Sequence, residues 1–115
     1  MPLMPQAATD FATFEANATE VAGILRALAN ERRLMILCKL VEWGEANVGS
    51  LAQAVGLSSS ALSQHLAKMR EEGIVDFRRE SQTLWYRIAD PRTEALLGHL
   101  QQLYCPAPLA GRKKK

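Results

Sequence analysis

The sequence predicts a mainly α-helical domain with one two-stranded β-hairpin, and three adjoining segments support this prediction. Residues 47–55 have the apolar spacing of a short helix, and residues 58–73 have that of a second helix, with a glycine-containing turn between them. Residues 74–88 alternate polar with β-branched or aromatic side chains on either side of a short polar turn, which predicts a hairpin. Two short helices joined by a tight turn and followed directly by a hairpin make up a winged helix-turn-helix.

The two helices of this motif are expected to have defined ends and buried faces. Ser58 is the expected N-cap of the second helix, because its hydroxyl can accept a hydrogen bond from the amide of Ser60 or Ala61. Gly73 is expected to close that helix in the left-handed conformation. The buried stripe of the second helix is predicted to be Leu62, Leu66 and Met69. The inward face of the first is predicted to be Val48, Leu51, Ala52 and Val55.

The outer face of the second helix carries only short polar or basic side chains. They are Ser59, Ser60, Ser63, Gln64 and Lys68. Such side chains approach base edges and phosphates closely, whereas bulky or acidic ones would clash with a duplex or repel it. A solvated amphipathic helix is the alternative interpretation, and it is a common one. The neighbouring turn and hairpin favour a helix that enters a DNA groove.

Three more helical patterns complete the predicted order α-α-α-α-β-β-α. A helix over residues 14–29 is indicated by a heptad-like seam of Phe11, Phe14, Ala18, Val21, Leu25 and Leu28. The next helix is capped by Asn30 and runs to Glu42, with one face formed by Leu34, Leu37, Cys38 and Val41. The last helix is capped by Asp90, has Pro91 at its first position, and carries a stripe of Leu96, Leu97, Leu100, Leu103 and Tyr104. Because both end helices have apolar stripes outside the motif, a two-fold helical interface between two copies is expected.

Length and composition predict a single domain. The chain has 115 residues, of which 48% are hydrophobic, and this is enough for a modest core. The domain is expected over residues 14–105, with a flexible arm over residues 1–13 and a basic, disordered tail over residues 106–115. No apolar run of about 18 residues and no secretion signal are present, so a cytoplasmic protein without membrane contact is expected.

The charge pattern indicates that a single copy would attract DNA only weakly. The formal net charge is +2, and four positive charges lie in residues 112–115, so the remainder of the chain is slightly acidic. Since non-specific affinity grows with the number of phosphates neutralised, two copies on one palindromic site are expected. The basic tail either adds salt-dependent affinity or serves as a solubilising end.

Several short motifs occur together in the order of a known family. They are LANERRLMIL at residues 28–37, SQHL at 63–66, EGIV at 72–75 and YRI at 86–88. Over residues 15–105 the chain resembles the ArsR/SmtB family of transcriptional repressors. The resemblance implies a homodimer that binds palindromic operator DNA near a promoter and releases it when an inducer is sensed.

The resemblance also implies which residues contact DNA. The matching positions are Ser59, Ser60, Ser63, Gln64 and His65 in the recognition helix, and Arg78 and Arg79 in the wing. His65 shares the helical sector of Leu62 and Leu66, so a histidine that packs against the core is an equally good interpretation.

Many members of the family that this chain resembles bind metals, so the resemblance raises the question of a metal site. The arsenic and cadmium sensors carry paired cysteines in the helix before the recognition helix, and residues 48–55 contain none. The zinc sensors place an aspartate and a histidine at the start of the last helix; Asp90 is present, but Arg92 stands in place of the histidine. His99 alone cannot supply the three or four ligands that zinc needs. No metal site and no cofactor are therefore predicted.

The two cysteines, Cys38 and Cys105, resemble the pair found in a dithiol branch of the family. That resemblance implies an inducer that is a persulfide, a polysulfide or an oxidant, and an oxidised pair that is a disulfide or a longer sulfur bridge with lower DNA affinity. In the alternative, the cysteines are structural, since buried cysteine behaves as a small hydrophobic residue, and the inducer is different, for example a metal ion.

Two other classes of protein are alternatives to a DNA-binding regulator. A thiol enzyme that handles sulfur would need an activated cysteine beside a base or a Cys-x-x-Cys pair, and the sequence shows neither. A winged helix that binds protein would be favoured by acidic side chains on the outer face of residues 58–69, where there are none. The sequence therefore predicts a DNA-binding regulator and not an enzyme.

Overall fold

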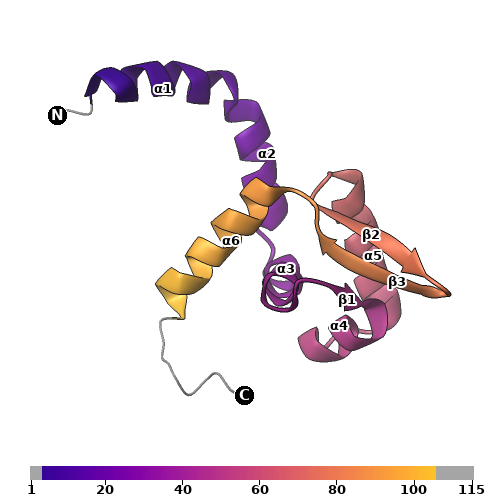
Figure 1. Ribbon diagram of the computed structural model, residues 1–115. Coiled ribbons are helices and arrows are strands. Elements are labelled where there is room, and N and C mark those ends of the chain that lie inside the picture. Colours follow the sequence, from indigo (N-terminus) through magenta and orange to yellow (C-terminus); the bar gives the residue numbers. More distant parts are fainter. Residues whose placement is uncertain (1–3, 106–115) are drawn as a thin grey trace.

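The computed structural model describes the backbone of residues 4–105 and the side chains of residues 10–105. Figure 1 shows a helical body from which a β-hairpin projects on one side. In chain order the elements are α1 (Met4–Ala16), α2 (Ala18–Leu28), α3 (Glu31–Trp43), β1 (Ala46–Asn47), α4 (Val48–Val55), α5 (Ser59–Glu71), β2 (Val75–Glu80), β3 (Thr83–Ile88) and α6 (Pro91–Tyr104). The mainly helical fold with a small antiparallel sheet confirms the predicted winged helix-turn-helix.

The helix-turn-helix is formed by α4 and α5, and polar caps define both helices. Asn47 Oδ1 accepts a hydrogen bond from the amide of Ser50 at 2.8 Å, which caps α4. Gly56 follows α4 in the left-handed conformation, with φ at +73°, and turns the chain toward α5. Ser58 Oγ then accepts a hydrogen bond from the amide of Ala61 at 3.0 Å, as predicted.

A second left-handed glycine ends α5 where the chain passes to the wing. Gly73 has φ at +79°. Its amide donates to the carbonyl of Arg70 at 3.0 Å, and the amide of Ile74 donates to that of Met69 at 2.9 Å. These two bonds form a Schellman motif, which satisfies carbonyl groups at the end of the helix. Strand β2 starts directly afterwards, so the wing is held close to the end of α5.

The sheet has the strand order β1-β3-β2, and the neighbouring strands are antiparallel. The hairpin turn lies between the paired residues Glu80 and Thr83, where the sequence predicted it. Strand β1 was not predicted, because two residues are too few to show an alternating pattern. It pairs with β3 and thereby joins the wing to the segment that follows α3.

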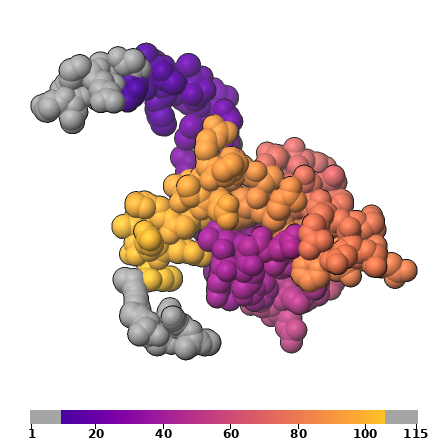
Figure 2. Space-filling view, in the orientation of Figure 1, coloured from indigo at the N-terminus to yellow at the C-terminus, as the bar shows by residue number. Residues whose placement is uncertain are grey.

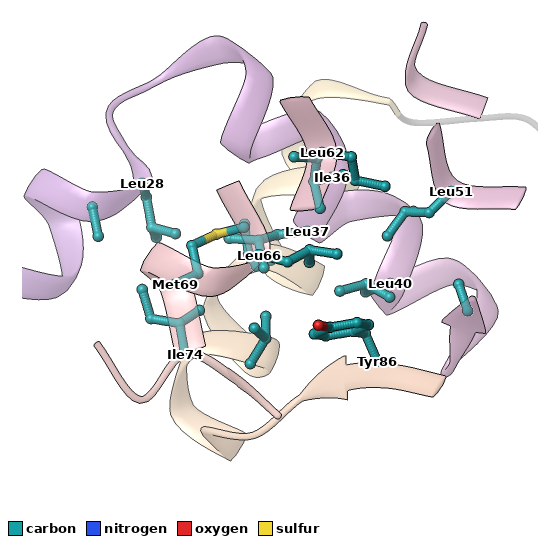
Figure 3. Close-up of a cluster of buried hydrophobic side chains, with 14 of the residues drawn as sticks. Leu28, Ile36, Leu37, Leu40, Leu51, Leu62, Leu66, Met69, Ile74 and Tyr86 are labelled. Carbon is teal, nitrogen blue, oxygen red and sulfur yellow. The ribbon is translucent and has the colours of Figure 1, made fainter. Parts of the chain in front are cut away.

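The core lies where α3, α4, α5 and α6 meet the base of the wing, as Figure 3 shows for its main side chains. Leu37 of α3 and Leu66 of α5 have no exposed surface, and Tyr86 of β3 is 8% exposed. Phe77 packs edge-to-face on Tyr86, with ring centroids 5.3 Å apart. Each buried leucine contributes about 1.5–3 kcal/mol. The inner face of α5 is therefore held firmly and its outer face remains free.

The buried face of α3 differs from the predicted one. Leu37 is fully buried as expected, but Ile36 and Leu40 complete the buried face. Cys38 and Val41 are half-buried. The difference arises because α3 packs against α6 on one side and against α4 and β3 on another, and side chains between these neighbours are the ones enclosed.

The N-terminal segment also differs from the predicted arm. Residues 4–16 form helix α1, which leads away from the body in Figure 1, and Figure 2 shows the same course for residues 10–16. The single helix expected over residues 14–29 is interrupted at Asn17, whose amide donates to the carbonyl of Phe14 at 3.0 Å. Alanine-rich composition favours the helix, and Pro5 lies in its first turn, where proline is tolerated. The sequence pattern did not predict α1 as a separate helix, because its apolar residues Phe11 and Phe14 also fit the seam of the following helix.

Helix α6 begins as predicted but is less enclosed than expected. Asp90 caps it by accepting a hydrogen bond from the amide of Arg92 at 3.0 Å, and Pro91 is its first residue. Of the expected stripe, Leu97 is fully buried, whereas Tyr104 is 81% exposed. The predicted tail over residues 106–115 lies outside the described residues. Among the helices described, none combines the length and the apolar character needed to cross a membrane.

Candidate nucleic-acid interface and cysteine pair

The outer face of α5 is exposed along its length. The five polar residues assigned to it are all exposed: Ser59, Ser60, Ser63, Gln64 and Lys68. Leu62 and Leu66, on the opposite side, have no exposed surface. A rigidly packed helix with a free face of short polar side chains has the form of a helix that docks in a major groove.

His65 lies at the border between the two faces of α5. Its side chain is half-buried, between the exposed Gln64 and the buried Leu66. His65 therefore belongs fully neither to the buried face nor to the exposed face of α5.

The two arginines of the wing have different surroundings. Arg78 and Arg79 are neighbours on β2, so their side chains leave opposite faces of the strand. Arg78 donates from Nε to Glu45 Oε2 at 2.6 Å and from Nη2 to Glu45 Oε1 at 3.0 Å. It also donates to Glu80 at 3.3 Å. Arg79 is exposed and forms no ion pair within the described part of the chain.

This pairing shifts the titration of both groups. The hydrogen bond from Arg78 lowers the pKa of the Glu45 carboxyl below its ordinary value. The same hydrogen bond raises the pKa of the Arg78 guanidinium above its ordinary value. Sequence reasoning missed Glu45, because it lies 33 positions from Arg78 and only the sheet brings the two together.

Other basic side chains near α5 and the wing are also paired. Arg70 bonds to Asp76 at 3.4 Å and lies 4.3 Å from the centroid of the Phe77 ring. Arg87 lies 4.0 Å from Asp76. Within the described residues of α5 and the wing, Lys68 and Arg79 are the basic side chains that form no ion pair. Within that part of the chain, no partner carboxylate therefore offsets the charge of these two side chains.

The two cysteines lie on helices that pack against each other. Cys38 is half-buried on α3, Cys105 is exposed at the end of α6, and both are free thiols. Gln101 Nε2 donates a hydrogen bond to the backbone carbonyl of Cys38 at 3.2 Å. The Cys105 amide donates to the carbonyl of Gln101 at 2.7 Å, so these two residues are one helical turn apart on α6. Sequence reasoning missed Gln101, although its spacing from Cys105 is that of residues sharing a helix face.

A cavity of about 480 Å³ borders the Cys105 side of this contact. Its lining residues are Glu42, Gly98, Gln101, Gln102 and Cys105. Glu42 lies one turn beyond Cys38 on α3. Cys105 therefore borders an open surface hollow that α6 shares with the end of α3.

The described residues contain no cluster of three or more histidine, cysteine or acidic side chains that could hold a metal ion. Both carboxylate oxygens of Asp90 accept hydrogen bonds at the start of α6: Oδ1 from the Arg92 amide, and Oδ2 from Thr93 Oγ1 at 3.0 Å. His99 is exposed on α6. The predicted absence of a metal site stays a prediction.

Comparisons with known proteins agree on one family. The family model described as bacterial regulatory protein, arsR family, matches residues 30–76. The chain is 42% identical to the transcriptional activator HlyU of Vibrio cholerae, over 93% of this chain and 98% of HlyU. It is 40% identical to the HTH-type transcriptional regulator YgaV of Escherichia coli, over 85% of this chain and 99% of YgaV. The crystal structure of the transcriptional repressor BigR from Xylella fastidiosa is similar with a TM-score of 0.75 at 38% identity, covering 84% of this chain and 97% of that one.

Proposed function

Since the chain belongs to the ArsR family and is a transcriptional regulator of that family, we propose that it is a repressor whose operator affinity falls when Cys38 and Cys105 are oxidised or bridged by sulfur. The observation that carries this proposal is the hydrogen bond from Gln101 to the Cys38 carbonyl. It joins the two cysteine-bearing helices within one helical turn of Cys105.

The DNA-binding part of the proposal assigns roles by position. The exposed face of α5 enters the major groove, where Gln64 and the serines contact base edges. Lys68 and Arg79 contact phosphates, because they form no ion pair within the described residues. His65 contributes at the edge of this surface, and Arg78 reaches phosphate only by leaving Glu45.

A second copy of the chain supplies the other half of the interface. Large apolar side chains are exposed on the helices at both chain ends: Phe11, Phe14, Leu25, Leu103 and Tyr104. Figure 1 shows α1, α2 and α6 on the side of the body away from the wing. Exposed apolar surface of this extent marks an interaction site. We infer a homodimer formed by these helices, which leaves both copies of α5 free for a palindromic operator.

The chemistry of release begins at the thiols. In one route, an oxidant accepts two electrons, both thiols lose their protons, and a disulfide forms. In the other route, each thiol takes one sulfur atom from a persulfide, RSSH, which leaves as RSH. Two cysteine persulfides then condense to a trisulfide and release hydrogen sulfide. Either bridge is covalent and ties α3 to the end of α6.

The bridge acts on DNA through the geometry of the dimer. Helix α6 belongs to the proposed dimer interface, and α3 packs against it and against α4. Two recognition helices have to lie about 34 Å apart to enter successive major grooves, so a small rotation prevents both from docking. If the binding free energy for the operator is less favourable by about 1.4 kcal/mol in the bridged protein than in the reduced protein, affinity falls tenfold.

The test is operator binding by the full chain, measured by fluorescence anisotropy on duplex DNA from upstream of its own gene. We expect at least about a tenfold loss of affinity after treatment with polysulfide, and recovery after reduction with dithiothreitol. Unchanged binding after mass spectrometry has shown a bridged protein would contradict the proposal. Enzymatic turnover of the sulfur donor without any change in binding would also contradict it.

A further inference from the structure

The guanidinium of Arg78 is already bound to an anion in the free protein. Glu45 accepts two parallel hydrogen bonds from it, at 2.6 and 3.0 Å. This bidentate geometry is the one in which arginine also binds a phosphate. Glu45 therefore occupies the donor groups that a DNA phosphate would use.

The sheet explains how Glu45 reaches Arg78. Arg78 on β2 is opposite Trp85 on β3, and Trp85 is opposite Asn47 on β1. Glu45 lies just before β1, and its side chain meets Arg78 across the middle strand. The guanidinium lies 5.8 Å from the centroid of the Trp85 ring. The ion pair therefore spans the sheet from the β1 edge to β2.

The charge balance of this cluster opposes DNA binding. Arg78 is flanked by two carboxylates, Glu45 and Glu80, so the three side chains together carry a net negative charge. Arg79, the next residue, forms no ion pair within the described part of the chain. Since affinity for duplex DNA depends on the number of phosphates that basic groups neutralise, the state of Arg78 changes that number.

We propose that Glu45 limits the affinity of this protein for DNA by withholding Arg78 from the phosphate backbone. The inference rests on the proposed function, because it assumes that the wing lies beside the duplex. Glu45 acts as a resident counter-ion, and Arg79 alone provides the phosphate contact of the wing while Arg78 stays paired.

The experiment compares the full-length wild type with Glu45→Gln on random-sequence duplex and on the operator, across a series of salt concentrations. Glutamine keeps the shape of glutamate and removes its charge. We expect binding to random duplex to tighten about threefold to tenfold, and the plot of log affinity against log salt to steepen by about 0.9 for each subunit. Circular dichroism checks that the variant keeps its helices.

Two further variants separate this role from a general effect of charge. Glu71→Gln removes the same charge from the exposed end of α5, where Glu71 forms no ion pair within the described residues, and we expect little change in its salt dependence. The second test introduces Glu45→Gln into a protein that already carries Arg78→Gln. Because the withheld arginine is then absent, Glu45→Gln should tighten DNA binding no more than Glu71→Gln does.

Three outcomes would overturn the inference while the wild type still binds its operator. They are an unchanged salt dependence in Glu45→Gln, a weaker affinity in that variant, and an equal gain in Glu71→Gln. Failure of the wild type to bind the operator at all would instead overturn the proposed function.

Discussion

The side chain of Gln101 on α6 donates a hydrogen bond to the backbone carbonyl of Cys38 on α3 at 3.2 Å. The donor belongs to the helix that ends at Cys105, and the acceptor belongs to the residue that carries the other thiol. The contact between α3 and α6 therefore involves the residue that carries one thiol and lies one helical turn from the residue that carries the other. A covalent bridge at this contact would fix two helices that are otherwise joined by weak interactions.

The first prediction concerns the thiols. Replacing Cys38 or Cys105 by serine should leave binding of the reduced protein to the operator within a few fold, because neither residue lies on α5 or the wing. The same change should abolish release by polysulfide, since one thiol cannot form the bridge. Anisotropy before and after polysulfide treatment measures both effects.

Mass spectrometry of the intact protein provides the matching control for the thiol prediction. The number of sulfur atoms in the bridge is given directly by the added mass, and Cys38→Ser or Cys105→Ser should show no internal bridge. Release that persists in both serine variants would mean that the cysteines are not the sensing groups.

The second prediction concerns base recognition by Gln64, which is exposed on the outer face of α5. Gln64→Ala should cost about 1–3 kcal/mol on the operator, because a lost bidentate contact to a base has this magnitude. Binding to random duplex should change little. Titrations on both duplexes under the same salt conditions measure the difference. An equal loss on both would show that Gln64 only contacts the backbone.

The third prediction concerns Arg79, whose charge is not neutralised by an ion pair in the described part of the chain. Arg79→Ala should weaken binding to operator and random duplex by similar factors, and it should make the salt dependence shallower by about 0.9 for each subunit. Arg78→Gln is the matched comparison, and we expect a smaller effect from it because Glu45 already holds that guanidinium.

Sequence patterns were sufficient for the parts of the structure that depend on local interactions. The cap at Ser58, the left-handed Gly73 and the hairpin turn beyond Glu80 follow from the chemistry of neighbouring residues, and the structure confirms all three. The pairing of Arg78 with Glu45 could not be predicted in this way. It depends on a two-residue strand whose pairing with β3 leaves no periodic signal.

The helices at the two ends of the chain show a different limit. The sequence identified their apolar residues but not their surroundings, because apolar spacing does not distinguish a core within one chain from an interface between two. Leu97 is buried in the chain itself, whereas Phe14 is 53% exposed. The break at Asn17 was also missed, since the seam continues in register on both sides of it.

The fourth prediction concerns the proposed dimer. Phe14→Glu should shift the protein toward the monomer, because it places a charge in surface that the second copy would cover. Operator affinity should then fall toward that of a single half-site. Sedimentation equilibrium measures the first effect. Ala12→Glu, which adds the same charge on the opposite face of α1, is the control, and an unchanged dimer in Phe14→Glu would place the interface elsewhere.

The fifth prediction concerns pH. The hydrogen bond from Arg78 lowers the pKa of the folded-state Glu45 carboxyl below the ordinary value of 4.5. A carboxyl with a lowered pKa stabilises the fold above its unfolded-state pKa, and this contribution is lost as pH falls through the folded-state pKa. The unfolding free energy of the wild type should therefore exceed that of Glu45→Gln most at neutral pH. The difference should disappear in acid, well below pH 4.5.

Urea unfolding at a series of pH values measures this difference, with the protein concentration held constant because dimerisation also contributes to stability. Arg78→Gln should lose the same pH-dependent contribution, since it removes the other half of the pair. Glu71→Gln should follow the wild-type curve. A difference between wild type and Glu45→Gln that is independent of pH would mean that the glutamine disturbs packing at the start of β1, and that the Glu45 charge contributes nothing to stability.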